Sequence, residues 1–316
     1  MMLQTFLTSM ESVVPIIVMI AAGFFMARMK WIDEKFGSAC SKFILNLALP
    51  CYMIWNLMEN FNRNSLIALA GGLLVPIITK GITYALSIPV SNVMKIPRGR
   101  KGIFRSICFA SNTIFVGLPI NLELFGPKSV PYVLLYYIVN TTFFWTLGNY
   151  EISCDGTPGS RAPLFSKATA RKLLSPALLG FIVGIILILL KVKLPSFAMD
   201  TLQYLGNPTT PLALIFIGLT LTTIPLCQLK LNREIIVLLI ARFVLSPALV
   251  ILALHFFPLP RLMGDVFIIQ SAMPAMTNTS IVAKEYGADY KFASVATIIT
   301  TLACIVAIPL LMAVIR

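Results

Sequence analysis

The sequence has little charge, few acidic residues and a single histidine. Only 12% of its 316 residues are charged, whereas a typical soluble protein has about 25%. Because 58% of the residues are hydrophobic, the composition excludes a soluble globular protein. We therefore expect an all-α integral membrane protein.

The 12 acidic residues avoid the interior of the apolar runs. Each lies in a loop or near the end of a run, and they are Glu11, Asp33, Glu34, Glu59, Glu123, Glu151, Asp155, Asp200, Glu234, Asp265, Glu285 and Asp289. Cation pumps and proton relays use carboxylates inside the membrane. The absence of such carboxylates argues against a cation–proton antiporter and favours an anionic substrate.

The residue patterns of enzymes and metal sites are missing too. The chain has no His-Glu-x-x-His motif, no glycine-rich phosphate loop and no cluster of cysteine and histidine. Its six cysteines are scattered, mostly inside apolar runs, as is typical of small side chains buried in a membrane protein. We expect neither catalysis nor a metal or other cofactor, while coupling to sodium or to a proton stays open.

Ten apolar runs are long enough to cross a bilayer, which takes about 20 helical residues. They cover residues 13–28, 43–58, 65–90, 103–122, 130–150, 174–190, 208–229, 235–257, 264–283 and 291–315. Of the 25 basic residues, 17 fall in loops on one side, six on the other and two inside runs. The positive-inside rule explains this pattern better than a nucleic-acid partner does. It predicts a plasma membrane (bacterial inner membrane) protein with both termini outside and the linker 151–172 in the cytoplasm.

The two halves of the chain resemble each other at an offset of 161 residues, which is 207 minus 46. At this offset polar and helix-breaking residues coincide: Pro15 with Pro176, Gly23 with Gly184, Lys30 with Lys191, Asn46 with Asn207, Pro50 with Pro211 and Gly126 with Gly287. Each half holds five runs, an odd number, so the second half enters the membrane in the opposite sense. The sequence therefore predicts ten transmembrane helices arranged as two inverted five-helix repeats.

Polar stretches interrupt the fourth and ninth runs in matching places. Residues 111–119 and 273–280 each combine asparagine, threonine and serine with proline or glycine. Irregular backbone inside a membrane is tolerated only where it is buried or lines a cavity. We therefore expect these two helices to break and cross, so that their positive N-terminal ends bind an anion.

The predicted substrate-binding residues come from these two stretches. They are Asn112, Thr113, Gly117, Pro119, Pro274, Thr277, Asn278 and Thr279, with Ser111, Ser280 and Gln270 in support. The alternative is that the polar side chains only hold helices together.

Two basic residues lie inside runs. Lys80 falls halfway along the third run, and Arg242 lies in the eighth, one residue from the repeat counterpart of Lys80. A cation inside the membrane costs about 2.5–3.5 kcal/mol on insertion scales, so it normally faces a cavity or a partner. We expect Lys80 to add positive potential to the substrate site. For Arg242 the alternative is snorkelling to the membrane surface.

Asn46 and Asn207 each lie four residues before a proline. They are predicted either to line the site or to bind carbonyls that a proline kink frees.

Three motifs of the sequence resemble those of the auxin efflux carrier family. The resemblance is carried by Asn46-Leu-Ala-Leu-Pro50, by Asn112-Thr-Ile-Phe-Val-Gly-Leu-Pro119 and by Met273-Pro274 with Thr277-Asn278, and it runs nearly end to end. It is closer to the compact bacterial members, often called malate or malonate permeases, than to the plant members. It implies the fold of the bile acid sodium symporters. In proteins with this fold, a transport domain that holds the crossed broken helices moves as an elevator against a scaffold, which is often dimeric.

The resemblance also implies assignments along the chain. Asn112, Pro119 and Pro274 take the crossover positions, and Lys80 is similar to a lysine that supports the substrate region in plant members. Plant members carry an acid one helical turn before that lysine, where this chain has Pro76. The implied scaffold covers 1–62 and 173–231, the implied transport domain covers 63–150 and 232–316, and the linker covers 151–172.

Together these features predict a secondary transporter of small organic anions, such as mono- or dicarboxylates and auxin-like acids. It is expected to form a homodimer in the lipid bilayer and to bind no nucleic acid. Two alternatives stay open. One is a sodium-coupled symporter of bulkier amphipathic acids such as bile acids, and the other is a sensor that binds an anion without moving it.

Overall fold

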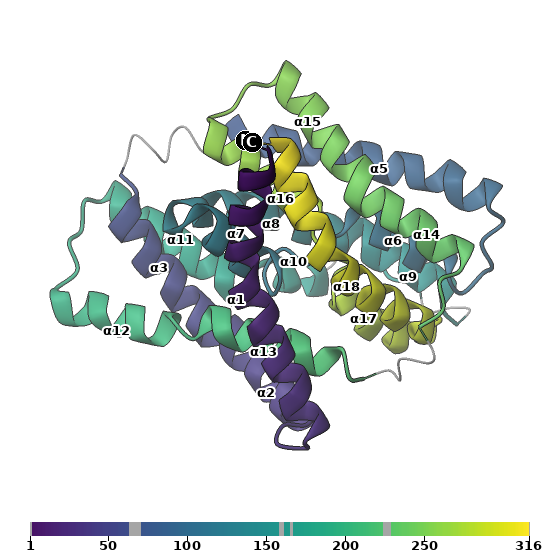
Figure 1. The fold of residues 1–316 in the computed structure, drawn as a ribbon, viewed down its shortest axis with the longest axis horizontal. Helices are drawn as coiled ribbons and strands as arrows, with labels where there is room; N and C mark the ends of the chain where they lie inside the picture. Colours follow the sequence, from purple (N-terminus) through teal and green to yellow (C-terminus); the bar gives the residue numbers. More distant parts are fainter. Residues whose placement is uncertain (1, 63–70, 158–160, 165–166, 224–228, 316) are drawn as a thin grey trace.

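The computed structural model describes residues 2–62, 71–157, 161–164, 167–223 and 229–315, which form helices and connecting loops without a β-strand. The helices, shown in Figure 1, are α1 Met2–Arg28, α2 Glu34–Phe43, η1 Ile44–Ala48, α3 Leu49–Asn60, η2 Gly71–Leu73, α5 Leu74–Val93, α6 Lys101–Phe109, α7 Gly117–Phe125, η3 Pro127–Ser129, α8 Val130–Phe143, η4 Phe144–Gly148, α9 Asn149–Asp155, α10 Lys167–Leu173, α11 Pro176–Leu189, α12 Ser196–Gly206, α13 Thr209–Thr220, α14 Arg233–Ile240, η6 Ala241–Leu245, α15 Ser246–Phe256, α16 Arg261–Ser271, α17 Asn278–Tyr286 and α18 Tyr290–Ile315.

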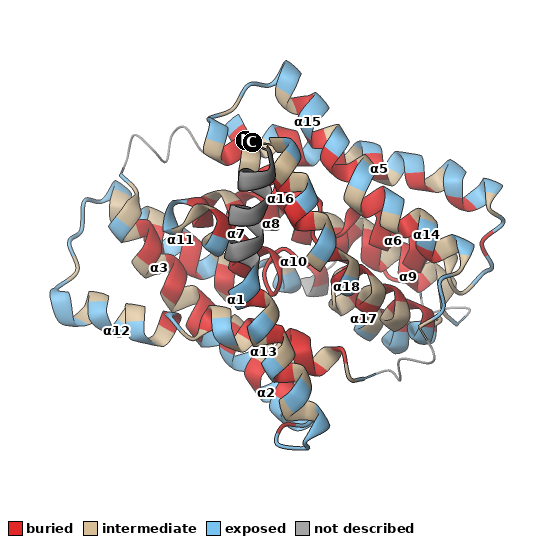
Figure 2. Cartoon of the chain, in the orientation of Figure 1, coloured by how far each residue is buried: buried red, intermediate tan, exposed pale blue. Residues whose placement is uncertain are grey.

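Four helical segments among the described residues are long and apolar enough to cross a membrane. They are Gly71–Val93, Pro127–Asp155, Arg233–Phe256 and Tyr290–Ile315, and two shorter apolar helices are Val14–Arg28 and Pro176–Leu189. Many large apolar side chains on the outer helices are exposed, as a lipid-facing surface requires (Figure 2). The chain is thus an all-helical, multi-pass membrane protein, and the number of ten spans stays a prediction.

Three of the long helices contain a π-helical turn, η1, η4 and η6. In η1 the N–H of Leu49 donates to the carbonyl of Ile44, five residues earlier, and Pro50 follows directly. In η6 Ser246 donates to Ala241 in the same way, and Pro247 follows. A proline has no N–H to continue the α-helical ladder, so the turn before it widens.

The helices pack in two groups, which we name the scaffold group and the transport group after the predicted domains whose residues they contain. In the scaffold group α1 lies against α13, and α3 lies against α11 and α12. In the transport group α5 packs against α15, α6 against α9, α8 against α16, and α17 against α18. The groups meet where α1 contacts α7 and α18 and where α8 contacts α11.

Two close contacts inside the scaffold group are related by the offset of 161 residues. A Cβ atom on Gly23 of α1 would overlap the backbone of Ile215 in α13. On Gly184 of α11 it would lie 2.8 Å from a methyl of Leu57 and 3.5 Å from the Cα of Ile54 in α3. Gly184 is the counterpart of Gly23, and Ile215 is the counterpart of Ile54. This pairing is consistent with two related halves, and their inverted arrangement stays a prediction.

The fourth and ninth predicted runs are both interrupted. The first half-helices, α6 and α16, end at Phe109 and Ser271, and the second half-helices, α7 and α17, begin at Gly117 and Asn278. An antiparallel backbone bridge joins Ser111 to Ala275 across the two interruptions. Pro119 lies in the first turn of α7, where its missing N–H disrupts nothing, and not at the break itself.

The predicted linker 151–172 begins and ends in helical structure. The fifth predicted run continues as α9 to Asp155, and α10 begins at Lys167. Between them Thr157 donates its N–H to the carbonyl of Tyr286 at 3.0 Å, and Ala162 donates to the hydroxyl of Ser153 at 2.9 Å.

Candidate functional site

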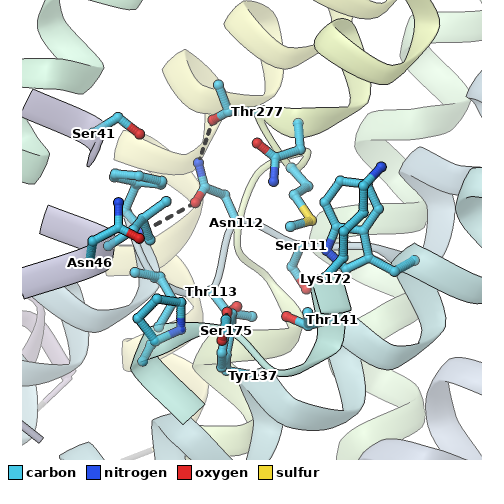
Figure 3. Close-up of a pocket in the computed structure, with 18 of the residues that line it drawn as sticks. Ser41, Asn46, Ser111, Asn112, Thr113, Tyr137, Thr141, Lys172, Ser175 and Thr277 are labelled. Carbon is cyan, nitrogen blue, oxygen red and sulfur yellow. Dashed lines mark hydrogen bonds between the residues drawn. The ribbon is translucent and has the colours of Figure 1, made fainter. Parts of the chain in front are cut away.

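A pocket of about 240 Å³ lies where the crossed interruptions face the scaffold group (Figure 3). The interruptions, α8 and η4 form its transport side, and α2, η1 and the start of α11 form its scaffold side. At this seam the hydroxyls of Tyr137 and Ser175 are 3.1 Å apart. Its lining residues are Ser41, Lys42, Leu45, Asn46, Ser111, Asn112, Thr113, Ile114, Phe115, Tyr137, Thr141, Trp145, Lys172, Ser175, Pro176, Ala177, Met276, Thr277 and Asn278.

Asn112 joins the two interruptions at the centre of this pocket. Its backbone N–H donates to the carbonyl of Pro274 at 2.8 Å, and its side-chain amide donates to the hydroxyl of Thr277 at 2.9 Å. Its side-chain oxygen accepts from the N–H of Phe115 at 3.2 Å, which orders the turn that leads into α7. A single buried asparagine therefore holds both breaks in register.

The N-terminus of α17 opens onto the pocket. Thr277 is its N-cap residue, yet its side chain makes no capping bond to the helix, because its hydroxyl accepts from Asn112. Asn278, the first residue of the helix, lines the pocket. The first N–H groups of a helix have no partner inside it, and the helix dipole is positive at this end. This end of α17 is therefore suited to a carboxylate.

Lys80 lies behind the pocket wall. Its ammonium donates to the carbonyl of Phe109 at 2.7 Å, to the side-chain oxygen of Asn140 at 2.8 Å and to the hydroxyl of Ser111 at 3.3 Å. Phe109 is the last residue of α6, so the ammonium neutralises the negative end of this half-helix. Lys80 does not line the pocket, but its partner Ser111 does.

Arg242 neutralises the negative end of α16, the first half-helix of the ninth run. Its guanidinium donates to the carbonyl of Ser271 at 2.9 Å, to that of Met273 at 3.0 Å and to that of Cys108 at 3.3 Å. The side chain is 1% exposed, so the snorkelling alternative is wrong. Arg242 lies in the π-helical turn η6.

The other predicted residues divide into those at the pocket and those away from it. Asn46 lines the pocket and also donates to the carbonyl of Lys42, four residues earlier, at 2.8 Å. Gln270 donates to the carbonyl of Thr113 at 3.3 Å and packs against Gly117. Like Lys80 and Arg242, seven other predicted residues do not line the pocket: Gly117, Pro119, Asn207, Gln270, Pro274, Thr279 and Ser280.

Two lysines at the pocket were missed by the sequence analysis. Lys42 and Lys172 line it, and no acidic side chain does so among the described residues. Both had been counted only toward membrane orientation. The spacing of Lys42 was the available signal, because it lies one helical turn before Asn46 and therefore on the same face.

The described residues contain no group of three or more histidine, cysteine, aspartate or glutamate side chains placed to hold a metal ion. The pocket offers amides, hydroxyls, a helix N-terminus and ammonium groups. These groups bind anions by hydrogen bonds and by charge.

Comparison with known proteins indicates a membrane transporter. A family model described as membrane transport protein matches residues 8–312. An uncharacterized transporter of Methanothermobacter thermautotrophicus is 25% identical over 310 residues, which cover 96% of this chain and 98% of the relative. An uncharacterized transporter of Methanocaldococcus jannaschii is 24% identical, covering 92% and 94%. A candidate malonate transporter of Rhizobium meliloti is 23% identical over 315 residues, covering 96% and 95%.

Proposed function

We propose, from the premise that this chain belongs to the membrane transport protein family, the family of the auxin efflux carriers, that it carries small organic anions across the membrane. The family and the relatives are transporters, so the chain is a transporter and not an enzyme. The substrates, the mechanism and the coupling below are our proposals.

One observation carries the choice of an anion. The N-terminus of α17 and the amides of Asn112 and Asn278 meet in a pocket that has two lysines and no acid among its described lining residues. Lys80 and Arg242 occupy the negative ends of the first half-helices, and the positive end of α17 is left for the ligand. A cation would meet an unfavourable potential there.

The size of the pocket favours a small acid. Pockets for drug-sized ligands measure about 300–1,000 Å³, and this one measures about 240 Å³. Mono- and dicarboxylates of a few carbons, or a compact auxin-like acid, match it better than a bulky bile-acid-like substrate. The printed name of the Rhizobium relative, which refers to malonate, is consistent with this choice.

The position of the pocket supports alternating access by an elevator movement. Its walls come from two groups of helices that pack mainly within themselves, the scaffold group and the transport group. We propose that the transport group carries the crossing past a scaffold that dimerises in the plasma membrane. In this proposal ten spans form two inverted repeats, and the offset-related contacts of Gly23 and Gly184 support them.

Transport into proteoliposomes tests the proposal. Purified protein is reconstituted, and uptake of labelled mono- and dicarboxylates is measured with and without sodium and a pH gradient. Saturable uptake of a small acid supports the proposal. Uptake limited to bulky amphipathic acids with sodium would favour the symporter alternative, and ligand-dependent thermal stabilisation without any uptake would favour a sensor.

A further inference from the structure

We propose that Lys42 and Lys172 form a subsite for a second anionic group of the substrate, in addition to the group that the helix crossing binds. This inference rests on the proposed function, because it names the residues that distinguish a dicarboxylate from a monocarboxylate. Both lysines line the same pocket as Asn112 and Asn278.

Lys42 approaches the pocket from the scaffold group. It lies on α2, and its carbonyl accepts the side-chain amide of Asn46 at 2.8 Å, which ties this turn of the helix to a second pocket residue. Its side chain is exposed. The ammonium can therefore reach a bound anion without breaking a contact within the protein.

Lys172 approaches the pocket from a different side than Lys42 does. It lies on α10, and its ammonium stands 4.2 Å from the ring centroid of Trp145 in η4, another lining residue. An ammonium over an aromatic face is held by the ring quadrupole, while its N–H groups stay available for hydrogen bonds. In the view of Figure 3, Asn112 lies between Asn46 on one side and Lys172 on the other.

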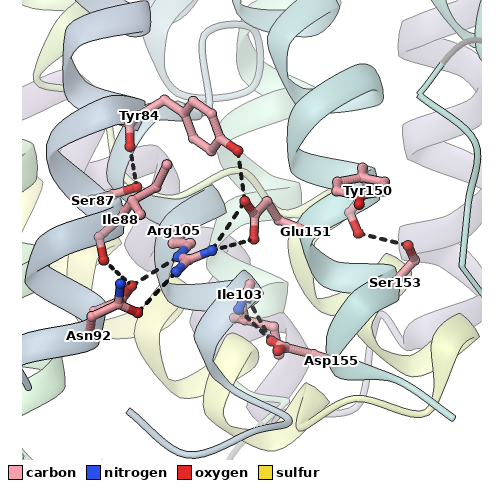
Figure 4. A network of polar contacts seen from close by, with 12 residues as sticks. Tyr84, Ser87, Ile88, Asn92, Ile103, Arg105, Tyr150, Glu151, Ser153 and Asp155 are labelled. Atoms are coloured by element: carbon pink, nitrogen blue, oxygen red, sulfur yellow. Dashed lines mark hydrogen bonds and ion pairs between the residues drawn. The ribbon is translucent and has the colours of Figure 1, made fainter. Parts of the chain in front are cut away.

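Unlike Arg100 and Arg105, these two lysines have no carboxylate partner among the described residues. Arg105 pairs with Glu151 at 3.0 Å in the network of Figure 4, and Arg100 pairs with Asp289 at 2.6 Å. Neither Lys42 nor Lys172 takes part in an ion pair within the described ranges. Their charge is thus available to an incoming anion.

The pocket exists only while its two walls face each other. Lys42 belongs to the scaffold wall, and the crossing belongs to the transport wall. Movement of the transport group would separate them. Lys42 is therefore expected to contribute to affinity only on the face to which this pocket opens, which the charge pattern predicts to be cytoplasmic.

Matched pairs of acids test the subsite. Malonate is compared with propionate and succinate with butyrate, in proteoliposomes, for the wild type, Lys42→Gln, Lys172→Gln and the double variant. Each single substitution should lower kcat/KM for the dicarboxylates about fivefold, and the double substitution about twentyfold, with a change below about twofold for the monocarboxylates. The KM change for Lys42→Gln should be confined to one face of oriented vesicles.

Lys35→Gln on α2 and Arg171→Gln on α10 are the controls, because they remove the same charge from the same helices without touching the pocket. They should leave the preference for dicarboxylates unchanged, and the double Lys→Arg variant should retain it. Equal losses for both classes of acid, or an unchanged ratio in the double Gln variant, overturn the subsite. Failure of the wild type to move any of the four acids would instead refute the proposed function.

Discussion

The side-chain amide of Asn112 donates a hydrogen bond of 2.9 Å to the hydroxyl of Thr277, and this contact joins two helix interruptions that are 165 residues apart in the sequence. Neither interruption can bind a substrate alone, because the pocket takes its polar groups from both. The first two predictions follow from this contact.

Substitution of Asn112 by alanine should reduce anion transport by about ten- to a hundredfold, since it removes the side-chain donor to Thr277 and the acceptor for Phe115. Initial uptake rates in proteoliposomes measure the effect. Asn207→Ala is the control, because Asn207 is exposed and lies away from the pocket. Wild-type rates in Asn112→Ala would remove Asn112 from the site.

Substitution of Asn278 by aspartate should abolish anion transport, because it introduces a negative charge where the positive end of α17 meets the pocket. Asn278→Ala should retain part of the activity, since the backbone N–H groups persist. Ser280→Asp, two residues further along α17 and away from the pocket, should be tolerated better. Comparable uptake by the two aspartate variants would argue that the helix end does not bind the substrate.

Substitution of Arg242 by methionine should destabilise the protein by about 3–5 kcal/mol, because the carbonyls of Ser271, Met273 and Cys108 would lose a buried charged donor. Thermal unfolding in detergent measures the loss. Arg233→Met, at the exposed start of the same span, should have little effect. Equal melting temperatures for the two variants would contradict the capping role of Arg242.

Three Gly→Ala substitutions should have graded effects on stability. Gly23→Ala should be the most harmful, because its Cβ meets the backbone of Ile215, which cannot move aside easily. Gly184→Ala should cost less, since the nearest atom is a methyl of the Leu57 side chain. Gly81→Ala in α5 faces open space and should stabilise by up to about 1 kcal/mol. Melting temperatures in the reverse order would contradict the packing of α1 against α13.

Much of the fold could be predicted because helix breakage has a local cause. Polar residues beside glycine and proline marked both interruptions, and the observed breaks fall at Ala110–Val116 and Ala272–Thr277. The direction of a long side chain has no such local cause. Lys80 and Arg242 were placed correctly inside the protein, but their partners are carbonyls that become available only when the half-helices end.

The two pocket lysines were not predicted from the sequence for a different reason. A lysine in a loop between spans is explained by membrane orientation alone. Lys172 therefore gave no separate signal in the sequence, and Lys42 gave only its spacing from Asn46. Their role depends on α2 and α10 approaching the crossing from different directions, which is a property of tertiary packing. The order at the two ends of the linker was likewise invisible, because its bonds to Ser153 and Tyr286 are not local in sequence.

The backbone bond from Asn112 to Pro274 has an evolutionary consequence. Because this hydrogen bond joins main-chain atoms of the two interruptions, substitution of the surrounding side chains leaves the bond in place. Descendants of one ancestor can then diverge in what they accept while keeping the same receptor framework, and sequence identities of 23–25% among full-length relatives are compatible with that history.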